Sequence, residues 1–237
     1  MIWRSLLLTL TIVFSSSSIT AAKGQTVTKS DCVILLHGLG RTHRSMNKIG
    51  KHLRANGYFV VNKGYNSREA TIPILAKSAV ETALQACPSE RTTHVVTHSM
   101  GGILLRQYLS TRGIPRLGNV VMLSPPNQGS EVVDRTGNWL IYKQILGPAG
   151  RQLTTDGFVR NLPPADFTVG IITGNRTVNP VLSTMFNGEN DGKVSVESSK
   201  LEGMTDHIVM PVNHTFMMRD KRVLQQIDHF LKFQRFE

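Results

Sequence analysis

The sequence is poor in aromatic and in acidic residues. Aromatic side chains make up only 6% of its 237 residues, and no run of basic residues interleaved with aromatics occurs. Such a run is typical of a nucleic-acid-binding surface, so we expect no nucleic acid as partner. Because 27 lysines and arginines face 16 acidic residues, the formal net charge is +11. The basic residues are scattered, and we interpret the charge as a general surface property that favours at most peripheral contact with an anionic membrane.

Metal-binding and dinucleotide-binding signatures are missing as well. Neither a CxxC nor an HExxH motif is present, so we expect no metal ion. The glycines at positions 38 and 40 begin a G-x-G-x-x-G fingerprint, but the third glycine is replaced by His43. No acidic residue ends the second predicted strand either, which excludes a dinucleotide fingerprint. The sequence therefore predicts no cofactor.

The N-terminal segment has the layout of a secretory signal peptide. Arg4 gives a positive start, residues 6–14 are apolar, and residues 15–22 are small or polar. The apolar stretch is short for a membrane span. We expect cleavage after Ala22, a mature domain over residues 23–237, and a periplasmic or secreted location. An uncleaved anchor is the alternative.

The chain has only two cysteines, Cys32 and Cys87. An exported chain meets an oxidising compartment, and an even count suits one disulfide. Cys32 begins the first predicted strand, and Cys87 ends the second predicted helix just before the central strand, so both belong to the amino edge of the sheet. We predict that they pair; two buried free thiols are the alternative.

Short apolar runs alternate with amphipathic segments along the rest of the chain, without a repeat or a low-complexity linker. Continuous apolar runs predict strands that are buried on both faces of a parallel sheet. The alternation predicts one α/β domain of three layers, with a mostly parallel central sheet of about six strands. The predicted strands are 31–36, 58–61, 92–97, 119–123, 167–173 and 207–212. The main predicted helices are 45–56, 71–86 and 223–233.

A sharp turn is predicted at Thr-His-Ser-Met-Gly-Gly, residues 97–102, between a strand and an amphipathic helix. Such a turn holds the Ser99 hydroxyl above the carboxyl end of the sheet, and the next N–H lies at a helix N-terminus, where it stabilises an oxyanion. Gly101 and Gly102 supply the small residues that a tight turn needs, whereas Thr97 stands where glycine is usual. The alternative is an ordinary serine N-cap.

A nucleophilic serine needs a base and a carboxylate that orients the base. His214 follows the last predicted strand and so emerges at the carboxyl edge, while His207 begins that strand and His229 lies within the last helix. Asp191 lies in a loop after the fifth predicted strand. Its rival Asp206 precedes a strand and belongs to the opposite edge. The Asn-Asp-Gly context of Asp191 is also typical of a simple turn or a calcium loop.

Three motifs together resemble the α/β-hydrolase superfamily, and more closely its secreted bacterial lipases and esterases. They are residues 37–40, residues 97–102, and residues 190–196 followed by 213–215. The resemblance implies Ser99 as nucleophile, Asp191 as acid and His214 as base, with the N–H groups of Leu39 and Met100 as oxyanion donors. His37 is expected to orient its loop rather than to act as a base. The chain begins at what is the third strand of the full fold, which implies a compact version.

These expectations amount to a monomeric serine carboxylester hydrolase that acts through an acyl-enzyme on lipid or other apolar acyl esters, without a cofactor. The long segment 124–166 is rich in apolar residues and includes Trp139. We interpret it as a cap that binds the acyl chain, with Trp139 as a substrate-binding residue; a helical insert that only completes the core is the alternative. An acyltransferase or an amidase with the same triad, and a non-catalytic binding module, remain alternative functions.

Overall fold

The computed structural model describes residues 31–136, 140–177, 186 and 188–237, without the side chains of 140–145. The predicted signal peptide, its cleavage point and Trp139 lie outside the described residues. Within the described ranges, no helix is long and apolar enough to cross a membrane.

One sheet of six parallel strands forms the centre of the molecule, in the order β2-β1-β3-β4-β5-β6. The strands are β1 (Cys32–Leu36), β2 (Phe59–Val61), β3 (Thr93–His98), β4 (Leu117–Leu123), β5 (Val169–Gly174) and β6 (Asp206–Met210). Each predicted strand is present, with ends that differ by at most two residues. The order of the sheet changes direction between β1 and β3, and ligands of such sheets bind at the carboxyl ends of the strands beside this point.

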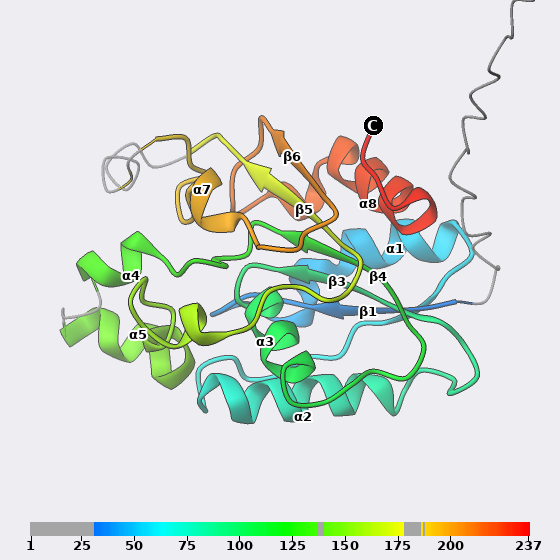
Figure 1. Ribbon diagram of the computed structural model, residues 1–237, viewed down its shortest axis with the longest axis horizontal. Coiled ribbons are helices and arrows are strands. Elements are labelled where there is room, and N and C mark those ends of the chain that lie inside the picture. The colour runs from blue at the N-terminus through cyan, green and yellow to red at the C-terminus, as the bar shows by residue number, and fades with distance from the viewer. Residues whose placement is uncertain (1–30, 137–139, 178–185, 187) are drawn as a thin grey trace, which may run out of the picture.

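Helices cover both faces of the sheet and make three layers (Figure 1). On one face lie α2 (Ile72–Leu84) and α3 (Met100–Leu109), and on the other lie α1 (Asn47–Ala55) and α8 (Lys221–Phe233). Alternate residues of β1 divide between the two cores: Ile34 packs with α2 and α3, and Leu35 packs with α1 and α8. The central strands are therefore buried on both sides, as the continuous apolar runs predict.

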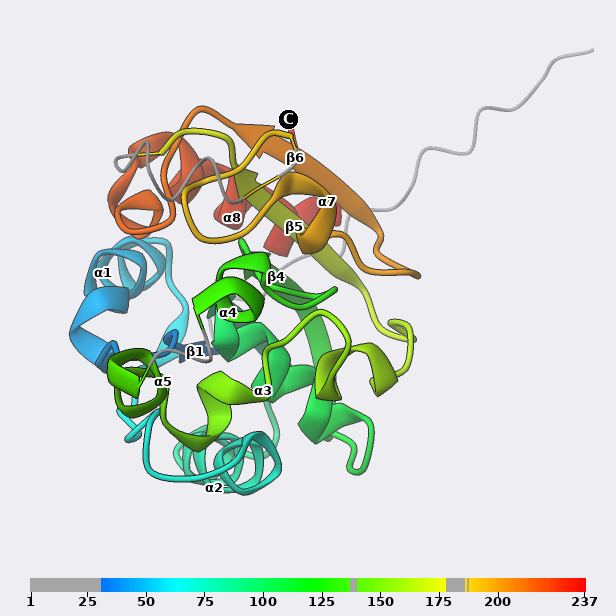
Figure 2. The same cartoon turned by 90° about the vertical axis from the view of Figure 1, so that its left-hand side faces the viewer.

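The remaining helices gather mainly beyond the carboxyl ends of the strands (Figure 2). They include α4 (Glu131–Thr136) and α5 (Leu140–Arg151), which belong to the segment 124–166. The short elements are η1 (His43–Met46), η2 (Phe158–Asn161), α7 (Val196–Ser199) and η3 (Met217–Arg219). The chain bends within α5 at Gly147, whose φ is 64°. A Cβ at this position would lie 2.4 Å from the Arg68 carbonyl oxygen. The backbone at residue 147 can therefore pass this close to Arg68 only because residue 147 is glycine.

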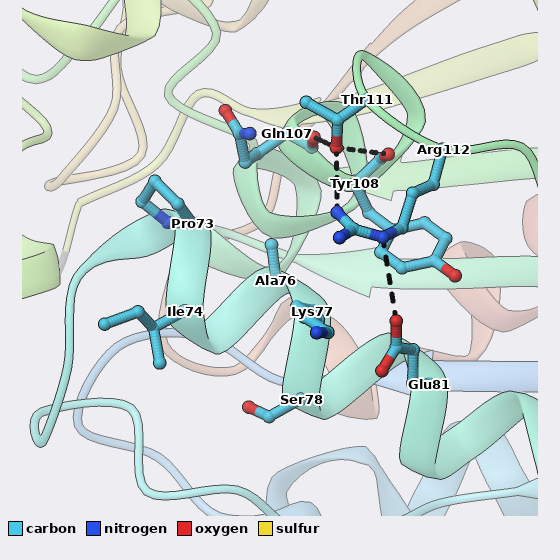
Figure 3. A pocket seen from close by; sticks show the side chains of 10 residues that line it. All are labelled: Pro73, Ile74, Ala76, Lys77, Ser78, Glu81, Gln107, Tyr108, Thr111 and Arg112. Carbon is cyan, nitrogen blue, oxygen red and sulfur yellow. Dashed lines mark hydrogen bonds and ion pairs between the residues drawn. The ribbon is translucent and has the colours of Figure 1, made fainter.

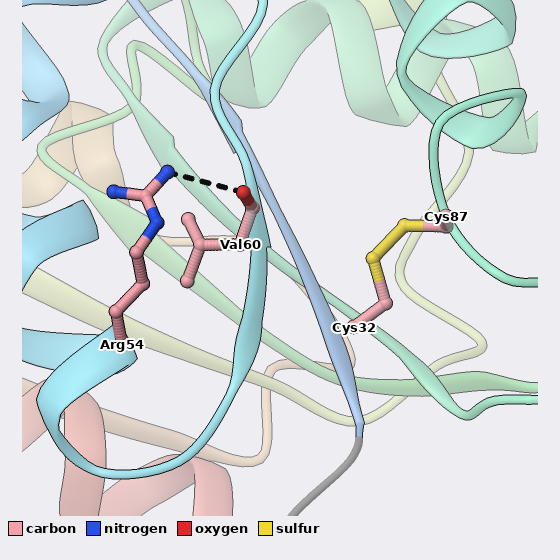
Figure 4. Close-up of a disulfide and its surroundings, with 4 residues drawn as sticks. All are labelled: Cys32, Arg54, Val60 and Cys87. Carbon is pink, nitrogen blue, oxygen red and sulfur yellow. Dashed lines mark hydrogen bonds between the residues drawn. A yellow bond between two sulfur atoms is a disulfide. The ribbon is translucent and has the colours of Figure 1, made fainter.

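The predicted disulfide between Cys32 and Cys87 is present, with Cα atoms 5.9 Å apart (Figure 4). It joins the first residue of β1 to the segment that follows α2. On the other side of β1, the Arg54 guanidinium donates a hydrogen bond of 3.1 Å to the carbonyl of Val60 in β2. The amino edge of the sheet is thus covalently tied to the helix layer on the α2 side.

Candidate active site

Ser99 occupies the turn between β3 and α3 with φ 54° and ψ −128°. A positive φ is strained for any residue with a side chain. The turn is held on both sides, because the Ser99 N–H donates to the Leu123 carbonyl and the Ser99 carbonyl accepts from the Gly102 N–H, each at 2.9 Å. A Cβ at Gly101 would lie 2.5 Å from the Leu36 carbonyl oxygen. The predicted strand–turn–helix arrangement is therefore present, and it requires glycine at position 101.

Thr97 stands where glycine is usual, and its side chain fits because Gly102, on the other side of the turn, has no side chain. Its side chain is fully buried, and its Oγ1 has no hydrogen-bond partner among the described residues. This oxygen lies only 3.2 Å from where a Cβ on Gly102 would stand. The second glycine of the motif thus makes the room that the threonine takes.

Asp191 and His214 form a buried pair next to this turn. The Asp191 Oδ2 accepts a hydrogen bond of 2.7 Å from the His214 Nδ1, and the His214 N–H donates to the Asp191 carbonyl at 3.1 Å. The Asp191 Oδ1 accepts from the N–H groups of Lys193 and Val194, at 3.0 and 2.9 Å. With Nδ1 protonated toward the carboxylate, Nε2 of a neutral His214 is left as an acceptor. The two residues come together as the sequence predicts.

The rival candidates lie elsewhere. Asp206 begins β6 at the amino edge of the sheet, where its carboxylate accepts from the N–H groups of His207 and Phe236. The His207 ring contacts the Thr173 hydroxyl at 2.9 Å. His229 lies within α8 and contacts the Arg235 carbonyl. None of the three lines the cavity at Ser99.

His98 is a site residue that the sequence analysis did not single out. Its ring packs against the His214 ring, with centroids 4.7 Å apart, and its Nε2 lies 3.0 Å from the His214 carbonyl oxygen. Burial, and then repulsion from His214, holds the pKa of His98 well below its ordinary value. A neutral His98 can donate its Nε2–H to that carbonyl and so support the His214 loop. Its position directly before the serine was the available signal.

His37 holds the loop after β1 against the serine turn. Its buried ring stacks on Tyr65 with centroids 4.0 Å apart, its Nδ1 lies 3.0 Å from the Gly38 carbonyl, and the Tyr65 hydroxyl donates to the His37 carbonyl. Burial lowers the pKa of His37. A Cβ added at Gly38 would lie 2.9 Å from the Ser99 Cβ, so this backbone passes directly over the serine. These contacts are those of a residue that orients the loop.

The two N–H groups that the resemblance implies as oxyanion donors flank Ser99. Leu39 follows the Gly38 peptide that touches the serine, and Met100 is the first residue of α3, whose N–H has no partner within the helix. In the described part of the chain, neither N–H donates a hydrogen bond to another group. Both are therefore available to a ligand oxygen.

Ser99 and His214 line one cavity of about 390 Å³. Its wall is apolar on the side of α4 and α5 and cationic elsewhere. The apolar wall includes Leu39, Val132, Val133, Leu146, Leu153 and Val194, and the cationic groups are Arg41, Arg68 and Lys193. Four of the apolar side chains come from the segment 124–166. Other residues of this segment, such as Val159 and Ala149, are fully buried in the core, so the segment both lines the cavity and completes the packing.

A second hollow, of about 540 Å³, lies between α2 and the end of α3 (Figure 3). Some of its polar groups have partners: the Arg112 guanidinium lies 3.7 Å from the Glu81 carboxylate, and the Thr111 hydroxyl contacts backbone carbonyls. It shares no lining residue with the Ser99 cavity and contains no histidine. Among the described residues, no group of three or more histidines, cysteines or acidic residues could hold a metal ion.

Solved structures similar to this chain include lipases, esterases and a phospholipase. The lipase BlEst2 of Bacillus licheniformis superposes with a TM-score of 0.70 in its propeptide form, at 20% identity over 86% of this chain, and with 0.67 in its mature form, at 18% identity over 86%. This chain spans 51% of the propeptide form and 92% of the mature form.

Two further lipid-hydrolysing enzymes are similar in structure. Lipase B of Aspergillus fumigatus gives a TM-score of 0.63 at 18% identity, over 85% of this chain and 52% of that one. Phospholipase PlaB of Legionella pneumophila gives 0.62 at 15% identity, over 85% of this chain and 58% of that one. No protein-family model and no curated protein matches the sequence itself. Together with the parallel six-stranded sheet, these likenesses show the α/β-hydrolase fold that the motifs predict.

Proposed function

We propose that this protein is a serine carboxylester hydrolase that acts on lipid or other apolar acyl esters. The observation that carries the proposal is the buried 2.7 Å hydrogen bond between His214 and Asp191, made by a histidine that lines the same cavity as Ser99. The strained turn at Ser99 supports it, because such backbone strain is typical of functional sites. Similarity to lipases and esterases, at identities of 20% or less, supports it through the fold alone.

The proposed mechanism uses only side chains and backbone of this chain. Ser99 Oγ attacks the ester carbonyl while His214 Nε2 takes its proton, and Asp191 stabilises the imidazolium. The N–H groups of Leu39 and Met100 bind the tetrahedral oxyanion, a contact that typically contributes about 10²–10³ in turnover. His214 then gives the proton to the leaving alcohol. Water, activated in the same way, hydrolyses the acyl-enzyme.

The apolar wall of the cavity is the proposed acyl-binding surface. It lies mainly on α4, α5 and the residues that follow, so we propose that the segment 124–166 acts as a cap over Ser99. Burial of an acyl chain there contributes about 0.8 kcal/mol per methylene. The role of Trp139 in acyl binding stays a prediction.

An ester panel tests this proposal. We expect the purified protein to hydrolyse p-nitrophenyl esters from acetate to dodecanoate, with a KM that falls as the chain lengthens. Ser99→Ala should lower kcat by at least about 10³-fold. The matched control is Ser110→Ala, at an exposed serine that follows α3, and it should keep full activity. Equal activity of the Ser99→Ala and Ser110→Ala variants on every ester would refute the assignment.

We also propose that the protein works outside the cytoplasm. The supporting observation is the Cys32–Cys87 disulfide, because disulfides persist mainly in oxidising compartments. Fractionation of the native host, followed by mass spectrometry of the N-terminus, should find the mature chain beginning at Lys23 in the exported fraction. Full-length chain retained in the cytoplasm would contradict this.

A further inference from the structure

Three cationic side chains line the cavity at Ser99: Arg41, Arg68 and Lys193. Arg41 lies in the loop after β1, and the Arg68 guanidinium reaches the same loop, because it lies 2.7 Å from where a Cβ on Gly40 would stand. Lys193 comes from a third loop, two residues after Asp191. Loops that are far apart in the sequence thus bring three positive charges to one cavity.

No salt bridge neutralises these charges in the part of the chain that the structure describes, although Asp191 attracts Lys193. None of the three is in an ion pair, and no aspartate or glutamate lines the cavity. Elsewhere on the described surface, Arg112, Lys200, Arg222 and Lys232 each pair with a carboxylate. Unpaired charges in a partly apolar cleft concentrate anions there.

Arg41 and Lys193 also repel one another. Lys193 is exposed as a residue. Burial of its ammonium group, followed by repulsion from Arg41, lowers the pKa of Lys193, and attraction to Asp191 acts in the opposite direction. Repulsion from Arg41 and from Lys193 also lowers the pKa of His98, which lines the same cavity. A bound anion would relieve this repulsion.

We propose that Arg41, Arg68 and Lys193 form an anion-binding subsite beside Ser99, and that the preferred substrate is an acyl ester bearing a phosphate group near the scissile bond. This inference rests on the proposed function and deepens it. Arginine guanidinium groups match the oxygens of a phosphate in pairs, and three cations suit a group with several charged oxygens. The apolar wall would hold the acyl chain while the cationic groups hold the phosphate.

Short-chain substrates test the subsite without a membrane surface. We compare kcat/KM for dibutanoylglycerol phosphate and for dibutanoylglycerol, both as dissolved monomers. The wild type should prefer the phosphate-bearing ester by about tenfold or more, and this ratio should fall by roughly threefold to tenfold in each of Arg41→Gln, Arg68→Gln and Lys193→Gln. The matched control is Arg44→Gln, at an exposed arginine of η1 outside the cavity, and it should keep the wild-type ratio.

Binding without hydrolysis separates this inference from the proposed function. The dibutyl ether of glycerol phosphate cannot be hydrolysed, and calorimetry should show it binding more tightly than the dibutyl ether of glycerol, with the difference reduced in the three variants. Inorganic phosphate should compete only weakly, because it lacks the acyl contacts.

Three outcomes would overturn the subsite: a wild-type ratio near one, an equal ratio in the three variants and the wild type, or inorganic phosphate binding as tightly as the ether phosphate. Loss of hydrolysis on every ester, with ether binding intact, would refute the proposed function and leave the subsite supported.

Discussion

Asp191 makes contacts through both oxygens of its carboxylate, and one of these contacts is with the histidine that lines the Ser99 cavity. Oδ1 accepts two backbone N–H groups of its own loop, and Oδ2 accepts from His214. The two backbone hydrogen bonds to Oδ1 therefore fix the orientation in which Oδ2 faces the imidazole. Asp206, at the opposite edge, accepts instead from the backbone N–H groups of His207 and Phe236.

Asp191→Asn should therefore lower kcat by about 10⁴-fold, because an amide nitrogen facing Nδ1 favours the wrong histidine tautomer. Asp206→Asn should change kcat little and serves as the control. Steady-state kinetics on a short-chain ester, with circular dichroism to verify folding, measures kcat for both variants and so decides which aspartate is the acid. A larger loss in Asp206→Asn than in Asp191→Asn would reverse the assignment of the acid.

At this scale, sequence and topology together predicted that Asp191 and His214 meet and that Ser99 lies at the same edge of the sheet. Ser99, Asp191 and His214 all follow strands of a parallel sheet, and the carboxyl ends of such strands share one edge. The cationic subsite could not be predicted in this way, because Arg41, Arg68 and Lys193 are scattered along the sequence. Only the paths of three loops bring their side chains to one cavity.

Among the elements, α3 links the serine turn to the proposed cap. Its Arg106 is buried, and the guanidinium donates to the carbonyls of Asn127, Leu162 and Pro163, which lie near the two ends of the segment 124–166. Burial lowers the pKa of Arg106 to about 10, so the side chain is still charged at neutral pH. One residue therefore holds both ends of the segment against the helix that begins at Ser99.

Arg106→Met should destabilise the fold by about 3 kcal/mol or more, because several buried carbonyls would lose their donor. Arg112→Met removes an exposed arginine just after the same helix, whose ion pair with Glu81 spans 3.7 Å, and should cost less than about 1 kcal/mol. Urea unfolding of both variants measures the difference. Equal midpoints for the two variants would show that Arg106 does not anchor the segment.

Apolar patterns alone do not predict the residues at which helices and strands begin and end. The pattern predicts a last strand that continues to Val212, but β6 ends at Met210, because Pro211 has no N–H for the sheet ladder. The closing helix begins at Lys221 rather than Val223, since the Asp220 side chain caps it by accepting the Arg222 N–H at 2.9 Å. Apolar periodicity thus locates an element, and backbone hydrogen bonding sets where it ends.

The whole molecule contains several histidines that folding keeps away from water. His37, His94 and His98 are each buried, and burial is the first cause that lowers the pKa of each below 6.5. The unfolded chain therefore binds more protons than the folded one once the pH falls below about 6.5. The stability contributed by these three groups is complete above that pH and is lost as the pH decreases.

We expect the free energy of unfolding to fall between pH 7 and pH 5.5, by up to about 1.4 kcal/mol per pH unit for each buried histidine. Urea titrations at half-unit steps give the slope. His94→Gln should make the slope shallower by one such contribution, whereas His43→Gln, at an exposed position, should leave it unchanged. A free energy that is constant or rises toward pH 5.5 would contradict this.

The central claim is that the fold activates Ser99 as a nucleophile, and covalent labelling tests it most directly. Incubation of the folded protein with a fluorophosphonate should attach one label per chain, and peptide mapping should place it on Ser99. Ser99→Ala, and wild-type protein denatured beforehand, should take up none, because an isolated serine hydroxyl is unreactive without its base and oxyanion donors. The contradictory result would be a folded wild type that stays unlabelled, or a Ser99→Ala variant that is labelled to the same extent.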